Sequence, residues 1–461
     1  MRMPILSRFA GALAVSLLCL APAAHAVDIQ TLPAGKGQEI WFVSDHTLPL
    51  IAMTAALPAG AAYDPAAKPG LANFAADLLD EGAGALNSNA FQTALSNRAI
   101  RLSVEPDRDY LIVSLVTLAG NAKDAFQLLG LALAHPRFDA DAIARVRAQI
   151  LAGLAHQDEE PSNVAAKAFF KTWFHGHPYG HAIGGEPASV ASVSAGDLRS
   201  FAATHWVGRG LKVAVSGDVD KDALEALLKT AFGPLPAGNL PPLPAVTHAG
   251  SAGVSVVTMP VPQPTAVFGL PGLLRSDPDY IPAYVANYII GGGGFSSRLT
   301  NEVRVQRGLT YDISTALESW RKSGLVLGEV ATRRGAMKQT ISVIRDTLKE
   351  FAANGPTDKE LADAKTYLTG SFPLAFSSNT GIAAQLNAFQ RVGLPVDYVQ
   401  KRNGLINAVT LDDVKRVAHR LYEPSKLSFV VAGSLAGDSA EPAPAAPPRS
   451  PAPSPAAQKH H

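Results

Sequence analysis

The chain has 461 residues, of which 47% are hydrophobic and 17% are charged. A chain of this length and apolar content exceeds one ordinary core, so two or more domains are expected. Forty basic residues against 39 acidic ones give a formal net charge of +1, which argues against an electrostatic nucleic-acid-binding surface and implies no charged partner.

The first 26 residues have the layout of a cleavable signal peptide. Arg2 and Arg8 precede an apolar stretch over residues 9–20. Residues 24–26 then read Ala-His-Ala, with small residues at the cleavage position. We therefore expect residues 1–26 to be removed. The mature protein is expected to be soluble and periplasmic.

Cys19 is the only cysteine, so the mature chain is expected to form no disulfide and no thiolate metal site. A lipoprotein anchor at Cys19 is the alternative to cleavage, but Leu18 stands where a lipid-attachment site requires a small residue. Beyond the signal peptide, no apolar run reaches the roughly 20 residues that a membrane span needs. We therefore expect no membrane span.

Residues 70–82 read Gly-Leu-Ala-Asn-Phe-Ala-Ala-Asp-Leu-Leu-Asp-Glu-Gly and predict a buried helix. They resemble the zinc-site helix of the pitrilysin, insulysin and mitochondrial processing peptidase family, which runs Gly-Leu-Ala-His-Phe-x-Glu-His. In that helix, two His four residues apart lie on one face and share one zinc ion. The resemblance places Asn73 and Asp77 at the two His positions and Ala76 at the position of the general-base Glu.

The family's third zinc ligand is a Glu upstream of a loop that here reads Asp-Glu-Glu-Pro over residues 158–161. Alignment on that loop puts the ligand position near Gly153, where there is no carboxylate. Catalytic zinc needs about three protein ligands and an open position for water. The resemblance therefore implies that this chain has no metal site or cofactor of its own.

Residues 174–181 read Phe-His-Gly-His-Pro-Tyr-Gly-His and are similar to a family loop between two helices. His175, His177 and His181 are an alternative metal-binding cluster. We favour a structural turn, because Gly and Pro indicate a turn and no acidic side chain accompanies the histidines.

The Pro- and Gly-rich segment 232–250 breaks both helix and strand periodicity and predicts a linker. It separates a predicted domain over residues 27–231 from a second over residues 251–437. Residues 193–217 align with residues 409–433 without a gap. Each copy predicts an Asp-led helix followed by a strand, and two homologous domains follow from this repeat.

The pattern of helices and strands predicts an α+β fold, in which each domain is an antiparallel or mixed β-sheet covered by helices. The family resemblance implies that the two domains form half of a clamshell-like chamber. Residues 438–461 are mostly Ala, Pro and Ser and predict a disordered tail, in which the terminal His460 and His461 are incidental.

Residues 291–311 are similar to the family's C-terminal signature: a glycine-rich turn, Ser-Arg-Leu, and then Arg304 with Tyr311 seven residues later. In family members, this Arg and Tyr reach toward the zinc-bound carbonyl of the substrate, where such donors stabilise a developing oxyanion. The resemblance implies that Arg304 and Tyr311 are catalytic. It also implies a substrate-binding turn, formed by Gly291, Gly292, Gly293 and Gly294.

Loss of the zinc ligands and retention of the C-terminal signature predict a non-zinc-binding subunit of a periplasmic metallopeptidase. Zinc is expected in a homologous partner subunit, and this chain would supply Arg304 and Tyr311 in trans and bind unstructured peptides in extended form. One alternative is a catalytically inert scaffold or peptide-binding protein of the same fold. Another is an autonomous metallopeptidase, for which His175 and His177 are the candidate ligands.

Overall fold

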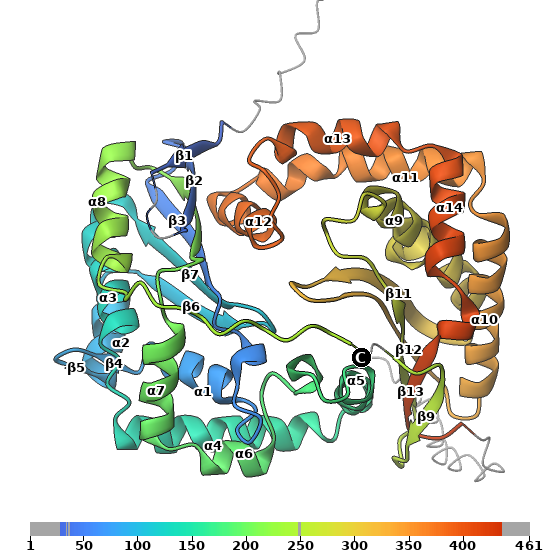
Figure 1. The fold of residues 1–461 in the computed structure, drawn as a ribbon, viewed down its shortest axis with the longest axis horizontal. Coiled ribbons are helices and arrows are strands. Elements are labelled where there is room, and N and C mark those ends of the chain that lie inside the picture. The colour runs from blue at the N-terminus through green and yellow to red at the C-terminus, as the bar shows by residue number, and fades with distance from the viewer. Residues whose placement is uncertain (1–27, 34, 36, 248–249, 436–461) are drawn as a thin grey trace, which may run out of the picture.

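The computed structural model describes residues 28–435, apart from residues 34, 36, 248 and 249. The chain forms two units, each a β-sheet with helices, which lie side by side (Figure 1). The predicted signal peptide and the predicted C-terminal tail lie outside the described residues. None of the described helices is long and apolar enough to cross a membrane.

The first sheet has six strands, in the order β1-β2-β8-β3-β7-β6. The strands are β1 (Gln30–Leu32), β2 (Glu39–Ser44), β3 (Leu50–Leu57), β6 (Arg101–Pro106), β7 (Leu111–Leu118) and β8 (Lys212–Gly217). β2 and β8 pair in parallel, whereas the other neighbours pair antiparallel, so the sheet is mixed. Seven of the eight residues of β3 are buried, as expected for a strand covered on both faces.

The helices of the first unit are α1 (Leu71–Asp77), α2 (Ser88–Asn97), α3 (Ala122–Ala134), α4 (Ala140–Gln157), α5 (Pro161–Trp173), α6 (Pro187–Ser192), α7 (Ala195–His205) and α8 (Lys221–Phe232). A short hairpin joins β4 (Gly82–Ala83) and β5 (Leu86–Asn87). The described residues between 233 and 252 form no helix or strand. This coil connects the two units.

The second sheet has five strands, in the order β11-β12-β10-β13-β9. The strands are β9 (Gly253–Val257), β10 (Thr265–Pro271), β11 (Thr310–Ser319), β12 (Gly324–Thr332) and β13 (Ser428–Ala432). The helices are α9 (Tyr280–Asn287), α10 (Met337–Asn354), α11 (Asp358–Gly370), α12 (Asn379–Arg391), α13 (Tyr398–Ala408) and α14 (Leu411–Leu421). β13 and β9 pair in parallel and the other neighbours antiparallel, so this sheet is mixed as well.

The internal repeat folds in the same way in both units. α7 begins with a capping box in which Ser194 and Asp197 bond each other's backbone N–H, and α14 begins with the same arrangement of Thr410 and Asp413. The strand that follows is buried in each unit, β8 in the first and β13 in the second. A capping box fixes where a helix starts, which explains why this segment aligns without a gap.

The two units exchange one helix each. α5 of the first unit packs on β10 and β13 of the second sheet, and α12 of the second unit packs on β3 and β8 of the first. Each exchanged helix has 13 residues. Neither sheet is therefore covered by its own unit alone.

Buried amide side chains hold α12 on the first sheet. Asn387 Nδ2 donates to the carbonyl oxygens of Thr54 and Lys212 at 3.2 and 3.0 Å. Gln390 Nε2 donates to the carbonyl oxygen of Val213 at 3.1 Å. A hydrophobic cluster surrounds these bonds and combines side chains of both units: Trp41, Val43, Ala214, Ile382, Leu386, Phe389 and Tyr398.

Asp197 and Asp413, the acidic residues of the two capping boxes, should make part of the free energy of unfolding depend on pH. Hydrogen bonds from Lys68 and Ser194 lower the pKa of Asp197 to about 2. Hydrogen bonds from Thr410 lower the pKa of Asp413 to about 2. Because the unfolded pKa of Asp is about 3.9, these carboxylates stabilise the fold above about pH 4 and lose that effect as the pH falls toward about 2.

Asp197→Ala and Asp413→Ala should each lower the free energy of unfolding by about 1 kcal/mol near neutral pH. The deficit should shrink as the pH falls through this window, measured by denaturant unfolding followed by circular dichroism. Glu225→Ala, at an exposed position within α8, is the matched control and should change little. A deficit that stays constant down to about pH 2 would show that the carboxylates do not act through their charge.

Candidate functional site

α1 keeps the shape of a zinc-site helix although its ligands are absent. Asn73 Nδ2 donates to Asp77 Oδ2 at 3.0 Å, so the two side chains lie on one helical face, as residues four apart should. Asp64 accepts hydrogen bonds from the backbone N–H groups of Gly70 and Ala72 at 2.6 and 2.7 Å and so caps the helix. Burial raises the pKa of Asp64 to about 7.

The polar face of α1 offers one carboxylate. Burial raises the pKa of Asp77 to about 6, even though part of this side chain remains accessible to solvent. Ala76, at the position of the general base, is buried with 2% of its surface exposed. This face therefore has no proton acceptor in the position that the family's Glu occupies.

Gly153 lies on α4, which packs against α1. A Cβ atom placed on Gly153 would meet no heavy atom within 4 Å, so the space beside it is open. Within the part of the chain that the structure describes, no three His, Cys, Asp or Glu side chains gather as a metal site.

The His loop is built as a turn. His177 is buried, its Nδ1 accepts from the backbone N–H of Tyr179 at 3.1 Å, and its Nε2 lies 3.1 Å from the carbonyl oxygen of Pro244. Both nitrogens thus have protein partners. His175 is exposed, and burial lowers the pKa of His181. These contacts favour the structural interpretation of the three histidines.

The glycine-rich turn lies between α9 and β11. A Cβ atom on Gly291 would come within 2.3 Å of Thr315 Oγ1, and one on Gly293 within 2.8 Å of the Tyr288 carbonyl oxygen. These positions therefore require glycine for close packing. Gly294 has a φ of +54° and open space around it, so it is the member of the turn that is free to approach a ligand. The substrate-binding role of the four glycines stays a prediction.

Arg304 lies between two exposed aromatic rings. Its guanidinium carbon is 4.4 Å from the ring centre of Phe295 and 4.6 Å from that of Tyr311. Tyr311 is 83% exposed and Phe295 is 72% exposed. Such stacking orients a guanidinium while leaving its N–H groups available. The Arg304 side chain has no hydrogen bond or ion pair with the other described residues, whereas its backbone carbonyl accepts from the Gly308 N–H at 2.9 Å.

Ion pairs of Arg298 hold the glycine-rich turn on the helices that follow it in the chain. Arg298 donates to both carboxylate oxygens of Glu360 at 2.6 and 2.8 Å and also pairs with Glu350. Although burial opposes it, the bonds from Arg298 and Thr357 lower the pKa of Glu360 to about 2. The signature's Ser-Arg-Leu segment thus fixes the base of the turn, and Arg304 and Tyr311 project from it.

Sequence reasoning missed the aromatic neighbours of these two residues. Among the described residues, the exposed Phe and Tyr side chains are Phe295, Tyr311 and Tyr367. Tyr367 stacks on Tyr288 at 5.1 Å, and the Tyr288 ring lies against the glycine-rich turn. Phe295 and Tyr311 therefore flank Arg304, and Tyr367 is connected to the glycine-rich turn through Tyr288. Exposed aromatic clusters are typical of binding sites, but exposure cannot be deduced from residue type.

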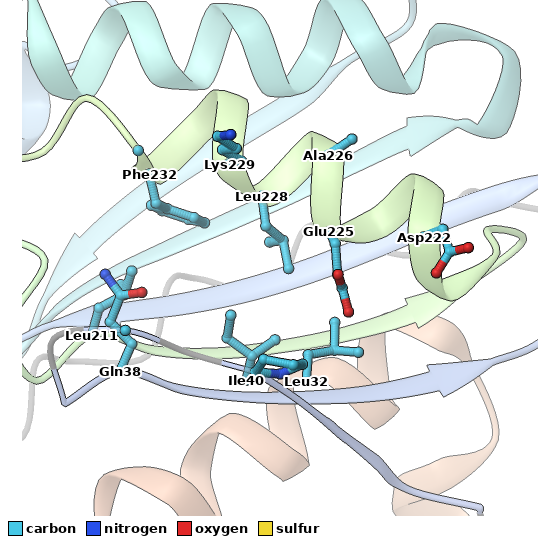
Figure 2. A pocket seen from close by; sticks show the side chains of 13 residues that line it. Leu32, Gln38, Ile40, Leu211, Asp222, Glu225, Ala226, Leu228, Lys229 and Phe232 are labelled. Carbon is cyan, nitrogen blue, oxygen red and sulfur yellow. The ribbon is translucent and has the colours of Figure 1, made fainter.

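A separate cavity of about 520 Å³ lies between α8 and the strands β1 and β2 (Figure 2). Leu228 and Phe232 point from α8 toward the strands, and Leu32 and Ile40 face them. The described residues that line this cavity include none of the predicted site residues. We therefore do not assign the functional site to it.

A zinc-site helix without its ligands and an intact Arg-Tyr signature define a metallopeptidase-like chain built from two similar units. Two domain families match it: Insulinase (Peptidase family M16) over residues 43–186, and Peptidase M16 inactive domain over residues 192–368. The chain belongs to peptidase family M16. The family resemblance of residues 70–82 and 291–311 is thereby confirmed.

Some similar proteins are named as proteases, and one is named as a non-peptidase homolog. The non-peptidase homolog YmxG of Helicobacter pylori is 26% identical over 401 residues, which cover 86% of this chain and 92% of that protein. An uncharacterized zinc protease of Mycobacterium tuberculosis is 28% identical over 306 residues, covering 64% of this chain and 68% of that protein.

The fold is confirmed by a crystal structure described as a peptidase M16 inactive domain from Pseudomonas fluorescens. It matches with a TM-score of 0.84 and 28% identity, and covers 90% of this chain and 100% of that one. A second solved structure, a protease from Helicobacter pylori, has a TM-score of 0.80 at 16% identity, with coverage of 88% and 100%. The predicted α+β architecture of two similar units is therefore correct.

Restoring the missing ligands should restore zinc binding, because α1 still presents positions 73 and 77 on one face. The triple variant Asn73→His, Asp77→His, Gly153→Glu should retain about one zinc ion per chain after dialysis, measured by elemental analysis. The unaltered chain from residue 27 to residue 459, which lacks His460 and His461, should retain no stoichiometric zinc. Stoichiometric zinc in the unaltered chain would contradict the lost-site interpretation.

Proposed function

We propose that this chain is the non-zinc-binding subunit of a periplasmic M16 metallopeptidase. In this proposal, a homologous zinc-bearing subunit binds the metal, and this chain supplies Arg304 and Tyr311 across a shared chamber. The observation that supports it best is the contrast between the two signatures. The positions that the family resemblance assigns to the zinc ligands hold Asn73, Asp77 and Gly153. By contrast, Tyr311 is exposed, Arg304 is half-buried beside it, and neither side chain forms a hydrogen bond with another described residue.

The retained pair suits acyl-transfer chemistry at a metal held elsewhere. A zinc ion in the partner subunit would supply the activated water for peptide hydrolysis, and negative charge would then develop on the carbonyl oxygen of the substrate. A guanidinium and a phenol that are already oriented stabilise this charge by a few kcal/mol per donor. Phe295 contributes by holding the Arg304 guanidinium over its ring, with the guanidinium carbon 4.4 Å from the ring centre. Neither chain alone would then complete the transition-state site.

Peptides are proposed to bind in extended form. β6 and β11 are edge strands of the two sheets, and an edge strand can add a peptide through main-chain hydrogen bonds. Tyr311 lies on β11 itself, so a peptide held along this edge would lie within reach of the phenol. Main-chain recognition of this kind predicts weak sequence preference.

An inert scaffold or peptide-binding protein of the same fold is the second candidate, and the non-peptidase name of the Helicobacter pylori relative favours it. The environment of Arg304 is an argument against it. The Arg304 guanidinium has no ion-pair partner among the described residues and lies against Tyr311, which is 83% exposed, and a scaffold requires neither feature. An autonomous metallopeptidase receives no support, since both nitrogens of His177 already have partners.

The test is reconstitution with a zinc-bearing homologue from the same organism. The isolated chain should not hydrolyse unstructured peptides, whereas adding it should raise the homologue's activity. In the reconstituted pair, Tyr311→Phe and Arg304→Ala should each lower kcat/KM by roughly 10- to 1,000-fold, mainly through kcat. The interaction strengthens only as the carbonyl becomes tetrahedral, so substrate binding should change little.

Asp77→Ala is the matched control and should leave the rate unchanged, because Asp77 stands at a ligand position that holds no metal in this proposal. Assembly of each variant pair should be checked by size-exclusion chromatography. An assembled pair whose rate is unaffected by both Tyr311→Phe and Arg304→Ala would favour the scaffold.

A further inference from the structure

The two units meet at the tips of two hairpins near the middle of the molecule (Figure 1). One tip is the turn between β6 and β7, and the other is the turn between β11 and β12. Asp109 joins them: its Oδ1 accepts from the Tyr179 hydroxyl at 2.6 Å, and its Oδ2 accepts from the backbone N–H of Arg321 at 2.8 Å. The Tyr179 hydroxyl also accepts from the Lys322 N–H at 3.2 Å.

A cavity of about 400 Å³ opens beside this junction. Its walls come from four segments that are distant in sequence: the two hairpin tips, the C-terminal end of α12, and the loop between β10 and α9. Trp320, Leu274 and Val392 provide apolar surface, and Tyr110 lies beside them. The volume falls within the range of sites that bind small molecules or single residues.

The charges around the cavity are unbalanced. Four cationic side chains and two carboxylates line it, so two positive charges are in excess: Arg275, Arg321, Lys322, Arg391, Asp107 and Asp109. The carboxylates are already satisfied within the protein. Asp107 accepts from Arg391 at 2.6 Å and from the N–H groups of its own turn, and Asp109 bridges the hairpins.

Three of the four cations have no carboxylate ion-pair partner among the described residues. One of these, Arg321, donates to the Tyr63 hydroxyl at 2.8 Å, which leaves Arg275 and Lys322 available. The Arg275 guanidinium is held over the rings of Tyr280 and Tyr398 at 4.4 and 5.0 Å, which orients its N–H groups without occupying them. Lys322 is exposed at the tip of its hairpin, and its ammonium group makes no ion pair there. Arg391 adds a buried Nε that has no hydrogen-bond acceptor.

We infer that this cavity binds a carboxylate group, with Arg275 and Lys322 as its principal ligands. A planar guanidinium and a nearby ammonium suit the two oxygens of a carboxylate, and the apolar walls suit the residue that carries it. The inference rests on the proposed function in one respect, namely that the natural ligand is a peptide. β11 runs from Thr310 to Ser319, so an extended peptide along it would reach from Tyr311 to this cavity.

The first test uses a small probe and needs neither a partner subunit nor a long peptide. N-acetylleucine should bind the mature chain roughly 10-fold more tightly than N-acetylleucinamide, measured by ligand-observed NMR titration. Lys322→Gln and Arg275→Gln should each remove most of this preference while leaving the weak amide binding unchanged. Lys338→Gln, an exposed lysine on α10, is the charge-matched control and should keep the preference.

The second test identifies the source of the carboxylate with three unstructured peptides of one sequence. The first has a free C-terminus, the second a C-terminal amide, and the third the amide together with one internal Asp. Tighter binding of the first alone assigns the site to the terminal carboxylate, and tighter binding of the third assigns it to an acidic side chain. Either result supports the site, provided that Lys322→Gln removes the difference.

Equal binding of N-acetylleucine and N-acetylleucinamide to the unaltered chain would overturn the inference. So would a preference for the acid that survives both Lys322→Gln and Arg275→Gln. If the small acid binds as expected but none of the three peptides does, the carboxylate site stands and the proposed peptide-binding function fails.

Discussion

The exchange of α5 and α12 is the constraint on which the rest of the structure depends. Each sheet needs a helix from the other unit to cover one face, so the two units cannot separate without exposing both. The amides of Asn387 and Gln390 add directional bonds to carbonyl oxygens of the first sheet, where an unpaired amide would be costly. A fixed relation between the units follows, and with it a junction at which the two hairpin tips can build a cavity.

Among the described residues, the positions that the family resemblance assigns to the zinc ligands form no metal site, and α1 nevertheless keeps its place in the fold. α1 contributes Leu71 and Phe74 to the core, and Asp64 caps its first turn, so the helix is retained for packing reasons. Asn73 and Asp77 stand where the family pattern has its two His ligands. Neither residue belongs to the hydrophobic core, so the identity of the side chain there has little effect on stability. The C-terminal signature is different, because Tyr311 is exposed, Arg304 is half-buried between two exposed rings, and neither residue belongs to the hydrophobic core. Their retention in this arrangement is the reason for assigning them a functional role.

The sequence predicted those features that depend on local patterns. The gapless alignment of residues 193–217 with residues 409–433 revealed the repeat, and the i, i+4 spacing placed positions 73 and 77 on one face. The helix exchange was not predictable, because an apolar helix face does not specify which sheet will cover it. Close packing of Gly291 on Thr315 and the exposure of Phe295 depend on contacts between segments. The carboxylate cavity combines four distant segments, so no local pattern could indicate it.

The central claim is that the surface around Arg304 faces the metal of a partner subunit. Cys19 is the only cysteine of the chain, so a form that begins at residue 27 has none. A single nitroxide label can be placed in that form by Val305→Cys, at a side chain that is 62% exposed beside Arg304. With cobalt in the partner's zinc site, the account predicts strong enhancement of the label's relaxation in the assembled pair. A label introduced by Leu118→Cys, at the end of β7, serves as the reference and should show less. Equal, weak enhancement at both positions in an assembled pair would contradict the account.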